Sequence, residues 1–155
     1  MRASAASLLV VALLAAAPGR AATLSSQTLS RPEGERQYLV ATPTVATPGK
    51  RALVIVLHGH GGSAAQALGQ RRGQAPLSLW LSIADREGIV VLAPDGVQAA
   101  DHQAGRNDCR EDSQDLPHSD DVGFIRALLD EAVQRYRVDP QRVYLIGMSN
   151  GGMMS

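Results

Sequence analysis

Three short runs of consecutive apolar residues most constrain what this chain can fold into. They occupy residues 52–57, 89–93 and 143–146, and a glycine or proline follows each within two residues. A short apolar run bounded by turn residues is typical of a parallel strand buried on both faces. Helical patterns at residues 77–87 and 119–137 separate the three runs. Strands that alternate with helices predict an α/β fold with a mostly parallel sheet.

An antiparallel hairpin is expected before the first of these strands. Residues 24–30 and 36–41 have strand-like patterns, and the segment between them contains Pro32 and Gly34, which favour a turn. Residues 97–118 are polar and irregular, and a loop of that length in a compact domain is usually functional or mobile. The predicted order is therefore hairpin, strand, helix, strand, loop, helix and strand.

The two predicted helices have apolar faces and recognisable ends. Gly88 is expected to end the first helix, and Ser119 or Asp120 to cap the second. Asp120 and Asp121 then lie at the positive end of the second helix dipole, and Glu131 pairs with Arg135. The first apolar face consists of Leu77, Trp80, Leu81 and Ala84, and the second of Val122, Ile125, Leu128, Leu129, Ala132, Val133 and Tyr136.

The first 22 residues have the features of a secretory signal peptide. Arg2 supplies a positive charge, and an apolar run fills residues 8–17. The run is too short to span a bilayer, and the small residues up to Ala22 suit signal peptidase. We therefore expect a signal peptide at 1–22 and a secreted domain at 23–155 with no membrane contact after cleavage. An uncleaved membrane anchor is the alternative.

Charge and cysteine content limit the classes of partner. The formal net charge is zero, so there is no electrostatic reason to expect nucleic acid as a partner. Cys109 is the only cysteine. In an exported protein, a single cysteine indicates a disulfide to a cysteine outside this sequence or an exposed free thiol, and a free, half-buried thiol is the alternative.

The last apolar run leads directly into a G-x-S-x-G motif formed by Gly147, Ser149 and Gly151. After a strand, this motif is typical of the nucleophile elbow of α/β-hydrolases, a strained turn that exposes the serine hydroxyl. The flanking glycines permit so sharp a turn. We interpret Ser149 as a catalytic nucleophile. The alternative is a serine in a glycine-rich loop, such as a phosphate-binding turn.

A second glycine-rich segment, His58-Gly59-His60-Gly61-Gly62, follows the first buried strand. Acyl transfer requires N–H donors for the oxyanion of the tetrahedral intermediate. In α/β-hydrolases one donor follows the serine, and the other lies in a loop of this kind. We expect the N–H groups of Asn150 and His60 to form the oxyanion hole, with Gly61 as the alternative to His60. His58 is expected to be a structural hydrogen-bonding residue rather than a base.

A metal site is the competing interpretation of the histidines and acidic residues. His58 and His60 are two positions apart, and further His and Asp residues lie in and beside residues 97–118. No H-x-x-x-H or comparable ligand spacing accompanies them. We therefore predict neither a metal nor a cofactor.

Five segments carry a more specific pattern: 57–63 (LHGHGGS), 84–96 (ADREGIVVLAPDG), 107–110 (NDCR), 120–129 (DDVGFIRALL) and 147–154 (GMSNGGMM). Together they resemble the polyhydroxybutyrate depolymerase and feruloyl esterase family, which consists of secreted α/β-hydrolase esterases. The resemblance covers residues 35–155. It implies that Ser149 is the nucleophile and that N–H groups near His60 and at Asn150 form the oxyanion hole. Family members often have cysteine where His60 stands, and residues 69–77 differ from the usual linking segment.

In this family the acid and the histidine of the triad follow the serine, and neither type of residue follows Ser149 here. We therefore expect the N-terminal part of an α/β-hydrolase domain, truncated after the elbow and inactive by itself. The resemblance implies that the whole protein is a serine esterase acting on polyhydroxyalkanoate or on feruloyl or acetyl polysaccharide esters through an acyl-enzyme. The alternatives are a non-catalytic binding protein of this fold and a secreted serine peptidase.

Overall fold

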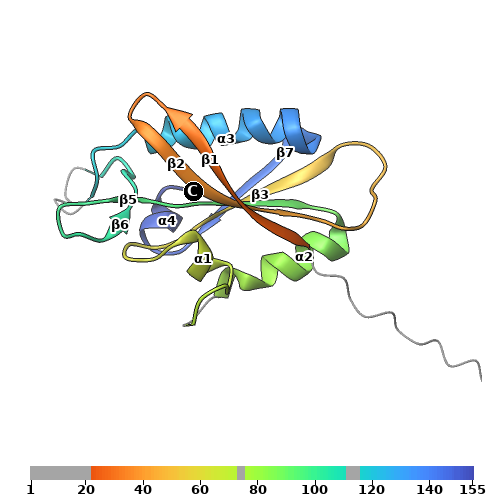
Figure 1. Cartoon of the computed structure of the whole chain (residues 1–155), viewed down its shortest axis with the longest axis horizontal. Coiled ribbons are helices and arrows are strands. Elements are labelled where there is room, and N and C mark those ends of the chain that lie inside the picture. The colour runs from red at the N-terminus through yellow and green to blue at the C-terminus, as the bar shows by residue number, and fades with distance from the viewer. Residues whose placement is uncertain (1–21, 73–75, 111–115) are drawn as a thin grey trace, which may run out of the picture.

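A five-stranded sheet with helices on both faces organises the chain (Figure 1). The structure is a computed structural model that describes residues 22–72, 76–110 and 116–155, so the predicted signal peptide lies almost entirely outside it. The strands are β1 (Thr23–Arg31), β2 (Gly34–Thr42), β3 (Arg51–Leu57), β4 (Val90–Pro94), β5 (Val97–Gln98), β6 (Ala104–Gly105) and β7 (Val138–Gly147). The helices are α1 (Ala64–Ala67), the 3-10 turn η1 (Pro76–Ser78), α2 (Leu79–Glu87), α3 (Asp121–Tyr136) and α4 (Asn150–Met153).

The strand order in the sheet is β1-β2-β4-β3-β7. β3 pairs in parallel with both β4 and β7, which confirms the parallel arrangement predicted from the three apolar runs. β1 and β2 form the predicted antiparallel hairpin, and β2 joins the sheet antiparallel to β4. The sheet is therefore mixed, and β3, which leads into the first glycine-rich segment, pairs directly with β7, which leads into the second.

The side chains of β3 alternate between two hydrophobic cores. Leu53, Ile55 and Leu57 pack with Phe124 and Leu128 of α3 on one face. Val54 and Val56 pack on the other face, with the side chains of α1 and α2. Figure 1 shows α3 above the sheet and α1 and α2 below it. Because successive side chains of a strand point to opposite faces, a strand covered on both sides must be apolar at every position.

Helix α3 begins as expected, at an Asp120 cap whose carboxylate accepts a hydrogen bond from Gly123 N–H at 2.8 Å. The predicted pair of Glu131 and Arg135 is also present, at 2.6 Å. The predicted apolar stripe is wrong at its first position, because Val122 is 39% exposed. Phe124 faces the core instead. The buried residues of α3 are Asp121, Phe124, Leu128 and Ala132, so the inward face begins at an aspartate in the first turn.

Other element boundaries also differ from the prediction. Part of residues 97–118, expected to be irregular, forms the small β5–β6 hairpin, and α1 was not predicted. The last strand starts at Val138, before the apolar run at 143–146 that predicted it, with an irregularity in its pairing to β3. Helix α3 ends at Tyr136, within one residue of the predicted end, and its C-cap residue Arg137 adopts the left-handed conformation at φ 58°.

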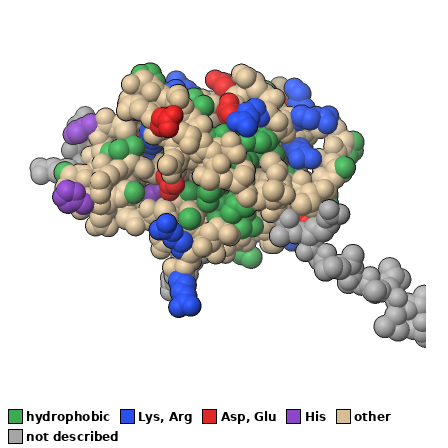
Figure 2. Space-filling view, in the orientation of Figure 1, with side chains coloured by type: hydrophobic (Ala, Val, Ile, Leu, Met, Phe, Trp, Pro, Cys, Tyr) green, Lys and Arg blue, Asp and Glu red, His purple; other side chains and the backbone are tan. Residues whose placement is uncertain are grey.

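The surface carries charges of both signs, and the face in Figure 2 shows basic and acidic side chains among hydrophobic ones. In the described part of the chain, no helix has the length and apolarity needed to cross a membrane. Cys109 is free and exposed in the structure, so the half-buried alternative is wrong.

Candidate active site

Ser149 lies at the sharp turn between β7 and α4. Its backbone has φ 49° and ψ −123°, a combination that costs a residue with a side chain on the order of 1–3 kcal/mol. The turn is held by two backbone hydrogen bonds, from Met148 N–H to the Leu57 carbonyl at 3.2 Å and from Gly151 N–H to the Met148 carbonyl at 2.9 Å. Ser149 is exposed, so the strained turn presents its hydroxyl to solvent.

The two glycines of the motif allow the turn to pack against β3. A Cβ on Gly147 would lie 2.2 Å from the carbonyl oxygen of Gly151. A Cβ on Gly151 would lie 2.4 Å from the carbonyl oxygen of Leu57. Backbone atoms occupy both positions, so any larger residue would push the elbow away from the sheet.

The segment His58–Gly62, named the oxyanion loop from here on, lies directly against the elbow. A Cβ on Gly59 would be 3.5 Å from the Cβ of Ser149. The carbonyl of Gly59 interacts with Nδ1 of His58 at 2.7 Å and accepts a hydrogen bond from Gly62 N–H at 3.0 Å. That carbonyl belongs to the same peptide unit as the N–H of His60. Fixing one side of the unit therefore fixes the direction of the N–H on the other side.

The backbone hydrogen bonds distinguish between the two candidate donors of this loop. Gly61 N–H already donates to the carbonyl of Ala104 at 2.8 Å. Among the residues that the structure describes, the N–H groups of His60 and Asn150 have no acceptor. Two unpaired N–H groups beside an exposed hydroxyl can stabilise an oxygen anion formed there.

Both ring nitrogens of His58 are engaged inside the protein. Gly96 N–H donates to Nε2 at 2.9 Å, so Nε2 is unprotonated and Nδ1 carries the proton that it donates to the carbonyl of Gly59. Burial, followed by the positive charge of Arg106, lowers the pKa of His58 to about 4. A neutral ring with both nitrogens paired fits the predicted structural role.

Arg106 connects the strand ends around the site and was not identified from the sequence. Its side chain is 1% exposed. Nη1 donates to the carbonyl of His58 at 2.7 Å, and Nη2 to the carbonyl of Pro94 at 2.6 Å. Burial lowers its pKa to about 10, so it remains charged at neutral pH. The residue therefore fixes the start of the oxyanion loop to the end of β4.

The side chain of Asn150 anchors the elbow to the same segment. Its Oδ1 accepts a hydrogen bond from Arg106 N–H at 2.9 Å, and its Nδ2 donates to the Arg106 carbonyl at 3.0 Å. Nδ2 also donates to Oδ2 of Asp108 at 2.8 Å. The residue after the serine is thus held by three hydrogen bonds, although the sequence suggested a role only for its backbone.

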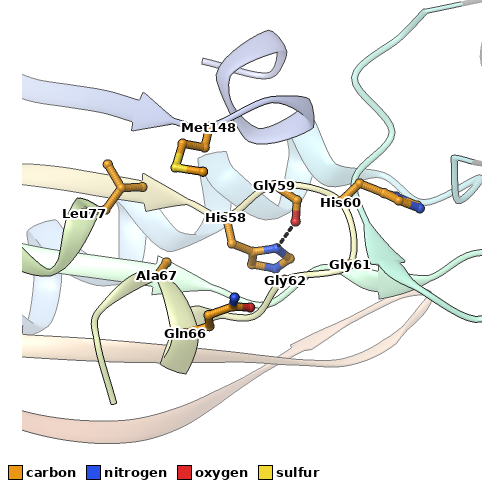
Figure 3. A pocket seen from close by; sticks show the side chains of 9 residues that line it. All are labelled: His58, Gly59, His60, Gly61, Gly62, Gln66, Ala67, Leu77 and Met148. Atoms are coloured by element: carbon orange, nitrogen blue, oxygen red, sulfur yellow. Dashed lines mark hydrogen bonds between the residues drawn. The ribbon is translucent and has the colours of Figure 1, made fainter. Parts of the chain in front are cut away.

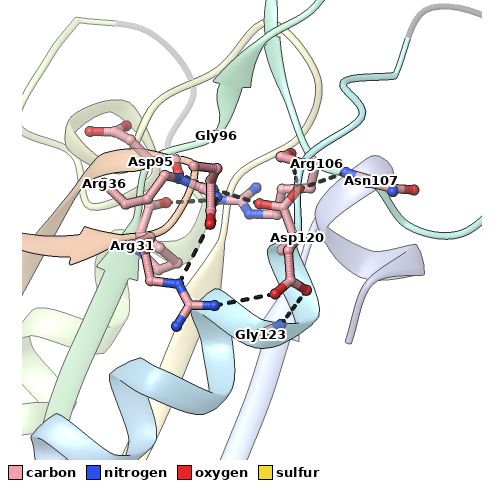
Figure 4. Close-up of polar contacts among 12 residues, drawn as sticks. Arg31, Arg36, Asp95, Gly96, Arg106, Asn107, Asp120 and Gly123 are labelled. Carbon is pink, nitrogen blue, oxygen red and sulfur yellow. Dashed lines mark hydrogen bonds and ion pairs between the residues drawn. The ribbon is translucent and has the colours of Figure 1, made fainter.

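A second buried arginine, Arg36, connects this network to helix α3 (Figure 4). Arg36 Nη2 pairs with Asp121 at 2.6 Å, and its guanidinium lies over the ring of Phe124. Asp121 also accepts a hydrogen bond from Asn107 N–H at 2.8 Å. The predicted helix-dipole role of Asp121 is therefore only part of its function, because the carboxylate also holds the segment next to Arg106.

Two cavities open beside the elbow, and His60 contributes to both. One has a volume of about 160 Å³ and is lined by the oxyanion loop and by Gln66, Ala67, Leu77 and Met148 (Figure 3). The other has a volume of about 370 Å³ and is lined by Ser149, Asn150, Asp101, Gln103, Arg110, Leu116 and Met153 in addition to His60. The first has apolar side chains on its wall and the second is mainly polar. The residues described here contain no group of three His, Cys, Asp or Glu side chains placed to hold a metal ion.

Comparison with known proteins finds relatives among esterases. The family model described as esterase PHB depolymerase matches residues 36–155. A putative esterase, NocK, from Nocardia uniformis subsp. tsuyamanensis is 38% identical over 111 residues, covering 71% of this chain and 29% of that protein. A poly(3-hydroxybutyrate) depolymerase from Ralstonia pickettii is 34% identical, covering 76% and 24% respectively. Feruloyl esterase B from Neurospora crassa is 33% identical, covering 92% and 45%.

Solved structures extend the comparison to the fold. An S-formylglutathione hydrolase from Agrobacterium tumefaciens has a TM-score of 0.64 at 18% identity, covering 89% of this chain and 52% of its own. A ferulic acid esterase has a TM-score of 0.61 at 18% identity, covering 86% and 52%. The chain thus spans less than half of the curated relatives above and about half of these structures. The expected α/β-hydrolase fold is confirmed, and the chain belongs to the esterase PHB depolymerase family.

Proposed function

We propose that the protein is a secreted serine esterase in which Ser149 is the nucleophile. The observation that carries the proposal is the strained backbone of Ser149, with an exposed hydroxyl beside the unpaired N–H groups of His60 and Asn150. Ser149 Oγ attacks the ester carbonyl carbon and its proton passes to a histidine. The two N–H groups stabilise the negative oxygen that forms.

Collapse of this intermediate breaks the bond to the alcohol oxygen, which takes the proton from the histidine and leaves. Water then hydrolyses the acyl-enzyme by the same steps. His58 is unsuited to the role of base because both of its ring nitrogens are paired. In the chain order of this fold, the acid and the histidine come after the serine. We propose that sequence beyond residue 155 supplies them and that residues 1–155 are inactive alone.

The names of the relatives suggest the substrate class, which we propose to be carboxylic esters of the polyester or feruloyl type. The intact protein is the chain together with the sequence that we propose beyond residue 155. Assaying it against p-nitrophenyl butyrate, methyl ferulate, a 3-hydroxybutyrate oligomer and a peptide amide tests this proposal. Hydrolysis of one or more esters is expected. Preferential cleavage of the amide would instead indicate a peptidase.

Substitution of the nucleophile tests the site itself. Ser149→Ala is expected to lower kcat for p-nitrophenyl butyrate by about 10⁴-fold or more. Ser82→Ala, a change at an exposed position of α2, is the control and is expected to keep the wild-type rate. A fluorophosphonate probe is expected to label Ser149 in the wild type. An unlabelled serine and an active Ser149→Ala variant would contradict the assignment, and an unlabelled, inactive wild type would favour a non-catalytic binding protein.

A further inference from the structure

The β5–β6 hairpin lies against the oxyanion loop and contacts two successive residues of it. Asp101, in the turn of the hairpin, places Oδ2 2.6 Å from Nε2 of His60. Three residues later, the carbonyl of Ala104 accepts the hydrogen bond from Gly61 N–H at 2.8 Å. One contact holds a side chain of the loop and the other holds its backbone. Neither contact involves the backbone N–H of His60, which is the proposed oxyanion donor.

The carboxylate of Asp101 is itself held in place. Its Oδ1 accepts a hydrogen bond from Gln103 N–H at 3.0 Å, so the other oxygen is directed at His60. The Gln103 N–H, followed by the His60 ring, lowers the pKa of Asp101, and the group is therefore ionised at neutral pH. A charged acceptor makes a shorter and stronger hydrogen bond to an imidazole N–H than a neutral one does.

The imidazole of His60 is enclosed on its other side by backbone. A Cβ on Gly105 would lie 2.8 Å from Nδ1 of His60, so the ring packs directly on this glycine. The ring is thus held between Asp101 at one nitrogen and Gly105 at the other. Its position is defined although 27% of the side chain is exposed.

We propose that Asp101 is a positioning residue for ester hydrolysis, which acts through the imidazole of His60 to hold the oxyanion loop in its active geometry. The inference rests on the proposed function, because it requires the His60 N–H to be an oxyanion donor. The contact matters for rate because a donor stabilises the oxyanion only within a narrow range of distance and angle. Displacing a reacting group by about 1 Å can cost about 10²-fold in rate.

A double-mutant cycle on the intact protein tests the proposal. Asp101→Asn keeps the size of the side chain and removes its charge, and His60→Ala keeps the backbone N–H and removes the ring. Each single variant is expected to lower kcat for p-nitrophenyl butyrate by about 10-fold, with KM within about twofold of wild type. The double variant is expected to be no slower than the slower single variant, because both changes remove the same contact.

Asp139 offers a closely matched control. Its Oδ1 accepts a hydrogen bond from Gln141 N–H at 3.1 Å, and its Oδ2 accepts one from Arg142 Nε at 3.0 Å. Its side chain is 27% exposed, against 25% for Asp101. It lies near the start of β7, at the opposite end of that strand from Ser149. Asp139→Asn is expected to leave kcat and KM at their wild-type values.

The outcomes separate this inference from the proposed function. Fluorophosphonate labelling of Ser149 in the wild type, with unchanged kcat in Asp101→Asn, would overturn the inference alone. Rate losses that multiply in the double variant would also overturn it. A raised KM with unchanged kcat would overturn it too, since it would mean that Asp101 contacts the substrate instead. Failure of the wild type to be labelled and to hydrolyse esters would refute both proposals together.

Discussion

The N–H of Gly96 donates a hydrogen bond to Nε2 of His58 over 2.9 Å, so an imidazole joins the ends of β3 and β4. This bond requires a neutral ring, because a protonated Nε2 has no lone pair to accept it. The pKa of His58 is about 4 in the fold, against 6.5 in an unfolded chain. Between these two values the unfolded chain binds a proton that the folded chain does not.

The protein is therefore expected to lose stability as the pH falls from 6.5 to 4, by about 3 kcal/mol from His58. The stabilising contribution of His58 to the free energy of unfolding is fully present above pH 6.5. It has been lost by pH 4, so lowering the pH further causes no additional loss from this residue. Denaturant unfolding at a series of pH values measures it. His58→Gln is expected to flatten the dependence of the free energy of unfolding on pH over this range. His118→Gln, at an exposed position, is the control and is expected to keep the wild-type dependence. Equal slopes in the wild type and His58→Gln would contradict the assignment.

Loss of the Arg106 guanidinium is expected to destabilise the fold. Arg106→Met leaves the buried carbonyls of His58 and Pro94 without a donor, at a cost of about 3 kcal/mol. Arg106→Lys replaces two guanidinium nitrogens by one ammonium nitrogen, which cannot occupy both positions, and is expected to lie between Met and wild type. Denaturant unfolding of the intact protein measures both. Arg126→Met, at an exposed position of α3, is the control, and a loss of equal size there would argue against a specific role.

The ion pair of Arg36 and Asp121 predicts that two aspartates of α3, Asp121 and Asp130, contribute very differently to the free energy of unfolding. Asp121→Asn leaves the charge of Arg36 buried without its partner, and we expect a loss of about 3–5 kcal/mol in the free energy of unfolding. Asp130→Asn removes an exposed carboxylate of α3 and is expected to change stability by less than about 0.5 kcal/mol. Similar melting temperatures for the two variants would show that the pair is not needed for the fold.

Gly151 and Gly152 are expected to differ sharply in how well they tolerate substitution by alanine. The Cβ of Gly151→Ala would lie 2.4 Å from the Leu57 carbonyl oxygen, and we expect a loss of about 3 kcal/mol together with weak fluorophosphonate labelling. The Cβ of Gly152→Ala would lie 3.2 Å from the Gly147 carbonyl oxygen, a contact that a small shift relieves. That variant is expected to label like the wild type. Equal labelling of the two would contradict the packing argument.

Much of the fold could be predicted because its central strands are buried on both faces. The continuous apolar run at residues 52–57 is typical of a strand covered on both sides, and it predicted a parallel sheet, although the pairing of β3 with β4 and β7 came only from the structure. Helix α1 was missed because four residues are too few to show a period. Its start was nevertheless marked in the sequence by Ser63 followed three residues later by Gln66, and in the structure Ser63 Oγ accepts a hydrogen bond from Gln66 N–H.

The candidate site was predictable where glycine and backbone define it, and not where long-range contacts do. The motif around Ser149 requires small residues at fixed positions, and such a requirement is visible in a sequence. Arg106 and Asp101 lie in a polar stretch, and nothing in that stretch distinguishes a buried arginine from an exposed one. Arg106 contacts His58, which is 48 residues away in sequence, and Asp101 contacts His60, which is 41 residues away, so only the fold identifies these contacts.

The close packing of the elbow on β3 limits how the candidate active site can evolve. Backbone atoms fill the space around Gly147 and Gly151, so neither position can be replaced by a residue with a side chain without moving the elbow. Met148 is 46% exposed and lines the smaller cavity together with Gln66 and Leu77. If the protein is the esterase proposed above, a saturation library at these three positions is the most direct route to an altered ester preference, because it reshapes the cavity wall and leaves the strained turn intact.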